Sequence, residues 1–153
     1  MKGNNMIIRT MELKDYDQVY ALWSEIKGFA IRTLHDSREG VEMFIKRNPH
    51  TSVVAEEYGK IIGSILCGHD GRRGCMYHVC VKKEYRKHGV GRKMVEGALN
   101  RLKNEGINKV NLIAFQSNSV GNEFWKMGGW TFREDVNYYE FNLNEGNVTN
   151  FIK

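Results

Sequence analysis

The stretch Val79–Arg92, VCVKKEYRKHGVGR, joins a predicted β-strand to a predicted helix through a basic loop with two glycines. Backbone N–H groups at the start of a helix lack partners and carry the positive end of the helix dipole. Glycine lets an anion approach the backbone closely, and the Lys and Arg side chains add positive charge. These features favour a pyrophosphate cradle. A tight strand-to-helix turn with a solvated basic face explains the same residues equally well.

The loop matches neither of two common phosphate-binding motifs, because G-x-x-x-x-G-K-[ST] and G-x-G-x-x-G are both absent. Its Arg86, Gly89 and Gly91 instead resemble motif A of the GNAT acetyltransferases, R/Q-x-x-G-x-G/A, and Val81–Arg86 resembles the usual lead-in to that motif. The stretch Asn118–Trp130, NSVGNEFWKMGGW, resembles motif B of the same family, N-x-x-A-x-x-x-Y-x-x-x-G-F. The two motifs stand in the family's order and spacing, which is more specific than either motif alone.

The resemblance implies acetyl transfer from acetyl-CoA to a primary amine of a small molecule or peptide, which the sequence does not identify. The backbone of Val79 and Val81 would hydrogen-bond the pantetheine arm, and the Val79 amide would polarise the thioester carbonyl. Asn118 would touch the arm or help to fix the acetyl group. The cofactor-binding residues implied in this way are Val79, Val81, Arg86, Lys87, His88, Gly89, Val90, Gly91, Arg92, Asn118 and Trp125.

Two departures from the family pattern concern the chemistry. Many members carry a tyrosine general acid in motif B, where this chain has Trp125. An indole N–H is a poor acid, so we expect Trp125 to pack against the CoA arm instead. Ribosomal-protein alanine acetyltransferases resemble the chain in motif A but carry a glutamate base where Ile113 stands. That subfamily is therefore disfavoured, and the subfamily stays unassigned.

The candidate catalytic residues come from strand alternation. A regular strand over residues 75–81 would direct Cys75, Tyr77, Val79 and Val81 to one face and Met76, His78 and Cys80 to the other. By resemblance the first face looks at the substrate, so Tyr77 is the preferred site residue and His78 is expected to be structural. Glu57, near the end of an earlier strand, is the second catalytic candidate, although a solvated rim carboxylate is the simpler interpretation.

The pattern along the chain predicts strands in runs, punctuated by helices. Strands are expected over 6–9, 52–58, 61–67, 75–81, 109–115, 130–133 and 137–143. Helices are expected over 13–27, from about 37 to before Pro49, over 90–103 and over 119–127. This order favours an α+β fold, with about four helices flanking a central twisted mixed sheet of about seven strands. We expect one acetyltransferase domain over 1–153, with a core over 6–143 and a polar tail over 144–153.

Composition narrows the remaining functional classes. The chain has 153 residues and a formal net charge of +5, its three cysteines lack C-x-x-C spacing, and its histidines show no H-x-x-x-H pair, so no metal site is expected. No apolar run approaches the roughly 20 residues of a membrane span, and no signal peptide is evident, so a cytoplasmic protein without a membrane partner is predicted. A nucleic-acid-binding module is disfavoured for lack of a recognition motif. An acyl-CoA-binding regulatory module with little catalysis is the alternative function, and a homodimer is left open.

Overall fold

Five strands form the central sheet of the computed structural model, which describes residues 2–153. Their order across the sheet is β1 (Met6–Thr10), β3 (Val53–Glu57), β4 (Lys60–His69), β5 (Gly74–Val81) and β6 (Val110–Leu112). The first four are antiparallel neighbours, whereas β6 pairs parallel to β5, so the sheet is mixed. A separate antiparallel pair joins β2 (Ala30–Arg32) to β7 (Thr149–Phe151).

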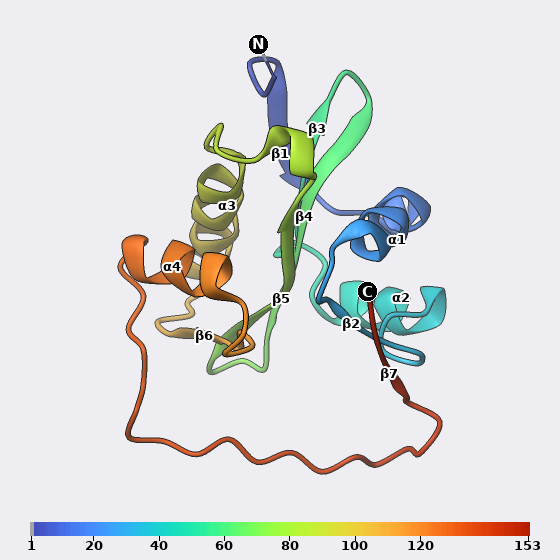
Figure 1. Ribbon diagram of the computed structural model, residues 1–153, viewed down its shortest axis with the longest axis vertical. Helices are drawn as coiled ribbons and strands as arrows, with labels where there is room; N and C mark the ends of the chain where they lie inside the picture. Colours follow the sequence, from blue (N-terminus) through green and yellow to red (C-terminus); the bar gives the residue numbers. More distant parts are fainter. Residues whose placement is uncertain (1) are drawn as a thin grey trace.

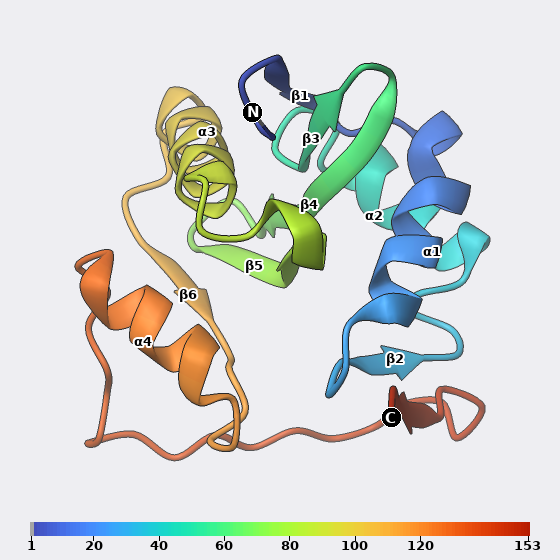
Figure 2. The same cartoon turned by 45° about the horizontal axis from the view of Figure 1, so that its top comes forward.

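Helices cover both faces of this sheet (Figures 1 and 2). Helix α3 (Val90–Asn104) lies on one face, and α1 (Tyr16–Glu25) and α2 (Arg38–Arg47) lie on the other, while α4 (Ser119–Met127) lies beside β6. The helix predicted over 90–103 is confirmed as α3, which buries one apolar stripe against the sheet at Val90, Met94, Val95, Ala98 and Leu102. The α+β class is thus confirmed. No helix within residues 2–153 is long and apolar enough to cross a membrane.

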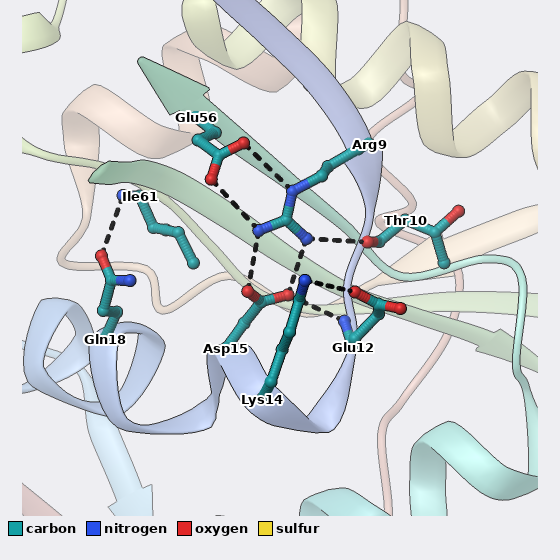
Figure 3. Close-up of polar contacts among 8 residues, drawn as sticks. All are labelled: Arg9, Thr10, Glu12, Lys14, Asp15, Gln18, Glu56 and Ile61. Carbon is teal, nitrogen blue, oxygen red and sulfur yellow. Dashed lines mark hydrogen bonds and ion pairs between the residues drawn. The ribbon is translucent and has the colours of Figure 1, made fainter. Parts of the chain in front are cut away.

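A buried ion-pair cluster fixes the start of α1 against the sheet (Figure 3). The Arg9 guanidinium donates two hydrogen bonds of 2.8 Å to the Asp15 carboxylate, and its Nε lies 3.3 Å from Glu56 Oε2. The Asp15 carboxylate also accepts from the Glu12 amide at 2.8 Å. Asp15 belongs to the 3₁₀ turn η1 (Leu13–Asp15), so these bonds join that turn to β1 and β3. Gln18 adds a further contact by accepting from the Ile61 amide at 3.1 Å.

The carboxyl-terminal part of the chain differs from the prediction. Residues 131–148, called the C-terminal segment below, form no strand, so the strands predicted over 130–133 and 137–143 were wrong. The segment runs as one extended stretch from α4 past the end of the sheet to β2 (Figures 1 and 2). The polar tail predicted over 144–153 contributes β7. Two bonds hold it, from the Gly28 amide to the Ile152 carbonyl and from the Ile152 amide to the Phe29 carbonyl. Sequence alternation reports strand propensity, but a strand forms only where a neighbouring edge is available.

Candidate active site

The parallel ladder between β5 and β6 is short, and this leaves an open edge. The two strands pair only from Gly74 opposite Val110 to Met76 opposite Leu112. Beyond that point β5 continues to Val81 with β4 on one side and no strand on the other within the described residues. An unpaired strand edge offers backbone donors and acceptors to an extended ligand. Val79 and Val81, the residues expected beside the pantetheine arm, lie on this stretch.

The amino terminus of α3 has no side-chain cap. Its N-cap is Gly89 in a left-handed conformation at φ 82°, whereas Ser37 caps α2 and the Asn118 side chain caps α4. Within residues 2–153, none of the backbone N–H groups of residues 87–92 donates a hydrogen bond to a protein acceptor. Six consecutive amides at the positive end of a 15-residue helix therefore remain free for an anion.

The charge and shape of the loop agree with this arrangement. Six basic side chains lie within residues 82–93, and none of them forms an ion pair within the described chain. They are Lys82, Lys83, Arg86, Lys87, Arg92 and Lys93. Arg86 instead donates from Nε to the Val81 carbonyl at 3.1 Å, which holds the loop against the end of β5. A Cβ atom built at Gly89 would have no neighbour within 4 Å, so the space above this glycine is open.

Helix α4 brings aromatic rings toward the loop. A Cβ atom at Gly91 would lie 3.4 Å from the Phe124 ring, so the two helices approach closely there. The Trp125 ring packs edge-on against Phe124 and Trp130, with centroids 5.0 and 4.9 Å away. Asn118 uses Oδ1 to accept the Gly121 amide at 2.9 Å. Trp125 is thus a packing residue in this structure, and Asn118 serves as a helix cap.

A β-bulge in β5 overturns the predicted facing of His78. Ser64 pairs with Cys80 and Leu66 with Tyr77, so two residues of β5, His78 and Val79, oppose one residue of β4. His78 takes φ 50°, which lies in the left-handed region that a histidine rarely adopts. The extra residue breaks the alternation, because it directs His78 to the same side of the sheet as Tyr77. Val79 and Val81 pack on the α3 side instead, so the expectation that they share a face with Tyr77 was wrong.

The contacts of these two side chains establish that common side. Tyr77 meets the Phe44 ring of α2 edge-on at 5.9 Å, and His78 packs on Trp23 of α1 at 4.7 Å. His78 Nε2 lies 2.9 Å from Asp36 Oδ1, and both side chains are almost fully buried. Asp36 is itself oriented by the Arg32 amide, which donates to Oδ2 at 2.7 Å. The sequence analysis missed Asp36, because it is 42 residues from His78 and no motif links them.

The two predicted catalytic residues lie far apart. Tyr77 pairs with Leu66 of β4 and is half exposed, and burial of its hydroxyl, followed by the Cys75 thiol, raises the pKa of Tyr77. Glu57 pairs with Lys60 at the opposite end of β4. The Glu57 carboxylate is buried and accepts the Gly3 amide at 2.9 Å. This position gives Glu57 a structural contact with the amino terminus and does not place it beside Tyr77.

Comparisons with known proteins agree on one family. A family model described as the acetyltransferase (GNAT) family matches residues 16–129. Acetyltransferase SG1711 of Sodalis glossinidius is 30% identical over 115 residues, which are 75% of this chain and 80% of that protein. Among solved structures, the PaiA N-acetyltransferase of Thermoplasma acidophilum in complex with coenzyme A has a TM-score of 0.72 and 17% identity, over 94% of this chain and 96% of that one. An aminoglycoside acetyltransferase from an uncultured soil metagenomic sample, in complex with sisomicin, has a TM-score of 0.69 and 19% identity, over 92% and 98% of the chains.

Proposed function

The chain belongs to the acetyltransferase (GNAT) family, and we propose that it transfers the acetyl group of acetyl-CoA to a primary amine of a small molecule or a peptide. That it is an acyltransferase with acetyl-CoA as co-substrate follows from the family itself. The amine is the proposed part, since structural neighbours below 25% identity share the fold alone. The observation that carries the proposal is the uncapped start of α3 beside the unpaired edge of β5.

The loop before α3 and the open edge of β5 would each bind a different part of acetyl-CoA. The free amides of residues 87–92 would hold the pyrophosphate, with the unpaired Lys and Arg side chains adding charge. The backbone of Val79 and Val81 would hydrogen-bond the pantetheine arm along the open edge. Trp125 and its ring neighbours would cover the arm from α4. Acetyl-CoA supplies a thioester, which is already activated, so much of the catalysis rests on positioning.

Tyr77 is the side chain that we propose at the acceptor side of the site. It stands where β5 and β6 part, and half of it is exposed. We do not retain Glu57 in a catalytic role, because its carboxylate is buried against the Gly3 amide. The amine proton would leave through ordered water to bulk solvent, since a tyrosine hydroxyl is a weak acid whose pKa burial raises further here, and the His78 ring is almost fully buried against Trp23.

A matched pair of substitutions tests the proposed cradle. Gly89→Asp places a side chain and a negative charge among the free amides, so CoA binding measured by calorimetry should be abolished. Gly106→Asp is the control, because Gly106 follows the other end of α3, has φ 83° and likewise has no neighbour within 4 Å of a built Cβ. The two variants share the backbone strain, and only the first touches the cradle. Unchanged CoA affinity in Gly89→Asp would overturn the assignment.

The acceptor and the alternative function are separated by a second assay. Thiol release from acetyl-CoA, measured against a panel of amines and peptides, identifies the acceptor class. Trp125 stands at the position of the family's tyrosine acid and favours one alternative, an acyl-CoA-binding regulatory module with little catalysis. CoA binding without thiol release for any amine would support that alternative and contradict the enzyme proposal.

A further inference from the structure

One residue in the interior of the central sheet has a backbone conformation that a strand does not normally contain. His78 takes φ 50° within β5. Among residues 2–153 the other non-glycine residues with positive φ are Tyr58, in the turn before β4, and Lys87, in the loop before α3. A non-glycine residue in the left-handed region is costly and persists only where its surroundings hold it there. The groups that hold His78 therefore decide the path of β5 at this point.

Groups from outside the sheet surround the His78 side chain. The imidazole packs on the Trp23 ring of α1, with centroids 4.7 Å apart, and stacks on Phe29, with centroids 5.2 Å apart. Its Nε2 lies 2.9 Å from Asp36 Oδ1, and the two side chains keep only 13% and 5% exposure. These contacts fix the position and direction of the ring, and they thereby hold the backbone of residue 78.

Asp36 is in turn fixed by α1 and by the connection between α1 and α2. Its Oδ2 accepts the Arg32 amide at 2.7 Å, and its own amide donates to the Arg32 carbonyl at 2.9 Å. The Asp36 carbonyl accepts the Tyr16 hydroxyl at 2.6 Å. Arg32 belongs to β2, which pairs with β7. Asp36 is therefore a fixed anchor on the α1 side of the sheet, and His78 is the residue that ties β5 to it.

The peptide group that follows His78 carries the Val79 amide. A peptide group is planar, so the direction of its N–H depends on the backbone angles of the residue before it. Val79 lies where the ladder from β5 to β6 has ended, beside the edge along which the pantetheine arm is proposed to bind. A donor aimed at the carbonyl of a bound thioester stabilises the negative charge that develops there when an amine attacks. The anchor thus acts, through one side chain, on an amide at the proposed reaction centre.

We propose that the contact between Asp36 and His78 aims the Val79 amide at the thioester carbonyl of bound acetyl-CoA. This inference rests on the proposed function. In the reaction the amine nitrogen bonds to the carbonyl carbon, the C–S bond breaks, CoA leaves as a thiolate and the amine proton passes to water. The carbonyl oxygen carries the negative charge between these events, and the Val79 amide faces that oxygen. His78 and Asp36 exchange no proton with the substrate, so both are positioning residues.

Substitutions at position 78 separate the anchor from the backbone conformation. Glycine and asparagine both accept a left-handed conformation. His78→Gly has no side chain to reach Asp36, and the His78→Asn side chain is shorter than an imidazole and falls short of it. Asp36→Ala removes the contact from the other partner. Val19→Ala is the matched control, because Val19 is fully buried in the same hydrophobic cluster as Trp23 and is not part of the anchor, so it lowers stability alone.

Infrared spectroscopy of acetyl-CoA with a heavy carbon isotope at the thioester carbonyl measures the aim of the amide without an acceptor amine. A hydrogen bond to a carbonyl lowers its stretching frequency. We expect a lowered frequency for ligand bound to the wild type and to Val19→Ala, and a return toward the free value in the three anchor variants. Calorimetry should give acetyl-CoA dissociation constants equal within about twofold. With an amine identified by thiol release, kcat should fall about 10–100-fold in the anchor variants, which is part of the roughly 10²–10³-fold effect of one oxyanion donor.

Binding and carbonyl frequency distinguish the possible failures. A wild type that binds no acetyl-CoA would overturn the proposed function and this inference together. Binding with a carbonyl frequency equal to that of the free ligand, or a lowered frequency that survives the loss of either partner, would overturn the inference alone. A return to the free value in Val19→Ala would do the same, because general destabilisation would then explain the effect. Far-UV circular dichroism checks that each variant is folded, and His78→Asn supplies the smallest change at the anchor.

Discussion

Replacing Asp15 by Asn removes the charge at the centre of the buried cluster that joins η1 to β1 and β3. The Asp15 carboxylate accepts three hydrogen bonds of 2.8 Å, two from Arg9 and one from the Glu12 amide. An amide side chain at position 15 would direct an N–H₂ group toward these donors and leave the guanidinium short of a partner. The substitution therefore breaks charge-assisted bonds without changing the volume of the side chain.

The size of the effect follows from the exposure of the partners. Removing one member of a buried ion pair costs about 3–5 kcal/mol. The side chains of Arg9 and Glu56 keep 25% and 22% exposure, so water screens part of this loss. We expect the free energy of unfolding to fall by about 2–3 kcal/mol at neutral pH. For a chain of this length that corresponds to a melting temperature lower by about 5–10 °C.

The same carboxylate makes the stability of the fold depend on acid pH. Burial acts to raise the pKa of Asp15, but the hydrogen bonds from Arg9 and the Glu12 amide outweigh it, and the pKa lies below its ordinary value of 3.8. Because the folded chain holds this proton less tightly than the unfolded chain, the stabilisation is complete above pH 3.8 and is lost as the pH falls further. Asp15→Asn should lack this part of the acid dependence.

Urea unfolding followed by circular dichroism, at neutral pH and across the acid range, measures both effects. Asp135→Asn is the matched control, because the Arg133 guanidinium donates two similar hydrogen bonds of 2.7 and 2.9 Å to the Asp135 carboxylate at an exposed site. An exposed ion pair contributes little to stability, so the control should unfold like the wild type. Equal effects of the two substitutions, or no effect of Asp15→Asn, would refute the reasoning from burial.

Three further predictions concern the site and the thiols. Trp125→Phe should keep most of the turnover, because the ring packs and donates no proton; a fall of several orders of magnitude with CoA binding intact would contradict this. Tyr77→Phe and His78→Ala should each lower kcat/KM by less than about a thousandfold across pH, as expected for a water relay, and a larger loss would identify a dedicated catalytic group. Burial raises the pKa of both Cys67 and Cys80 to about 12, so thiol titration at pH 8 should label them only after unfolding.

The sequence correctly predicted the helices and strands whose pattern of polar and apolar residues is long and local. The helix predicted over 90–103 is found at Val90–Asn104, and the hairpin predicted over 52–58 and 61–67 is found as β3 and β4. The loop before α3 combines glycines, charge and a helix start in one short stretch, so its motif was visible without a structure. The family that this motif indicated was confirmed by the family model.

The features that the sequence did not reveal depend on distant partners. β2 and β7 have three residues each, which is too short for periodicity, and they pair across more than a hundred residues. The row from Tyr139 to Leu143 has the alternation of a strand but belongs to no strand of the structure, because alternation does not supply a neighbouring edge. The contact between His78 and Asp36 depends on a bulge, and a bulge leaves no mark in the polar and apolar pattern.

The bulge inserts into β5 one residue that the α3 side of the core does not use. Met76 and Val79 both face the α3 side of β5, three positions apart, whereas a regular strand would return to that side after two. A chain shortened by one residue at position 78 would keep both of them against α3 and would restore a one-to-one ladder with β4. The α3 side of the core would therefore keep its packing, whereas the other side would lose the His78 ring that packs on the buried Trp23. His78 is thus an extra residue in the strand. It contacts Trp23 and Asp36, on the side of the sheet where Tyr77 lies.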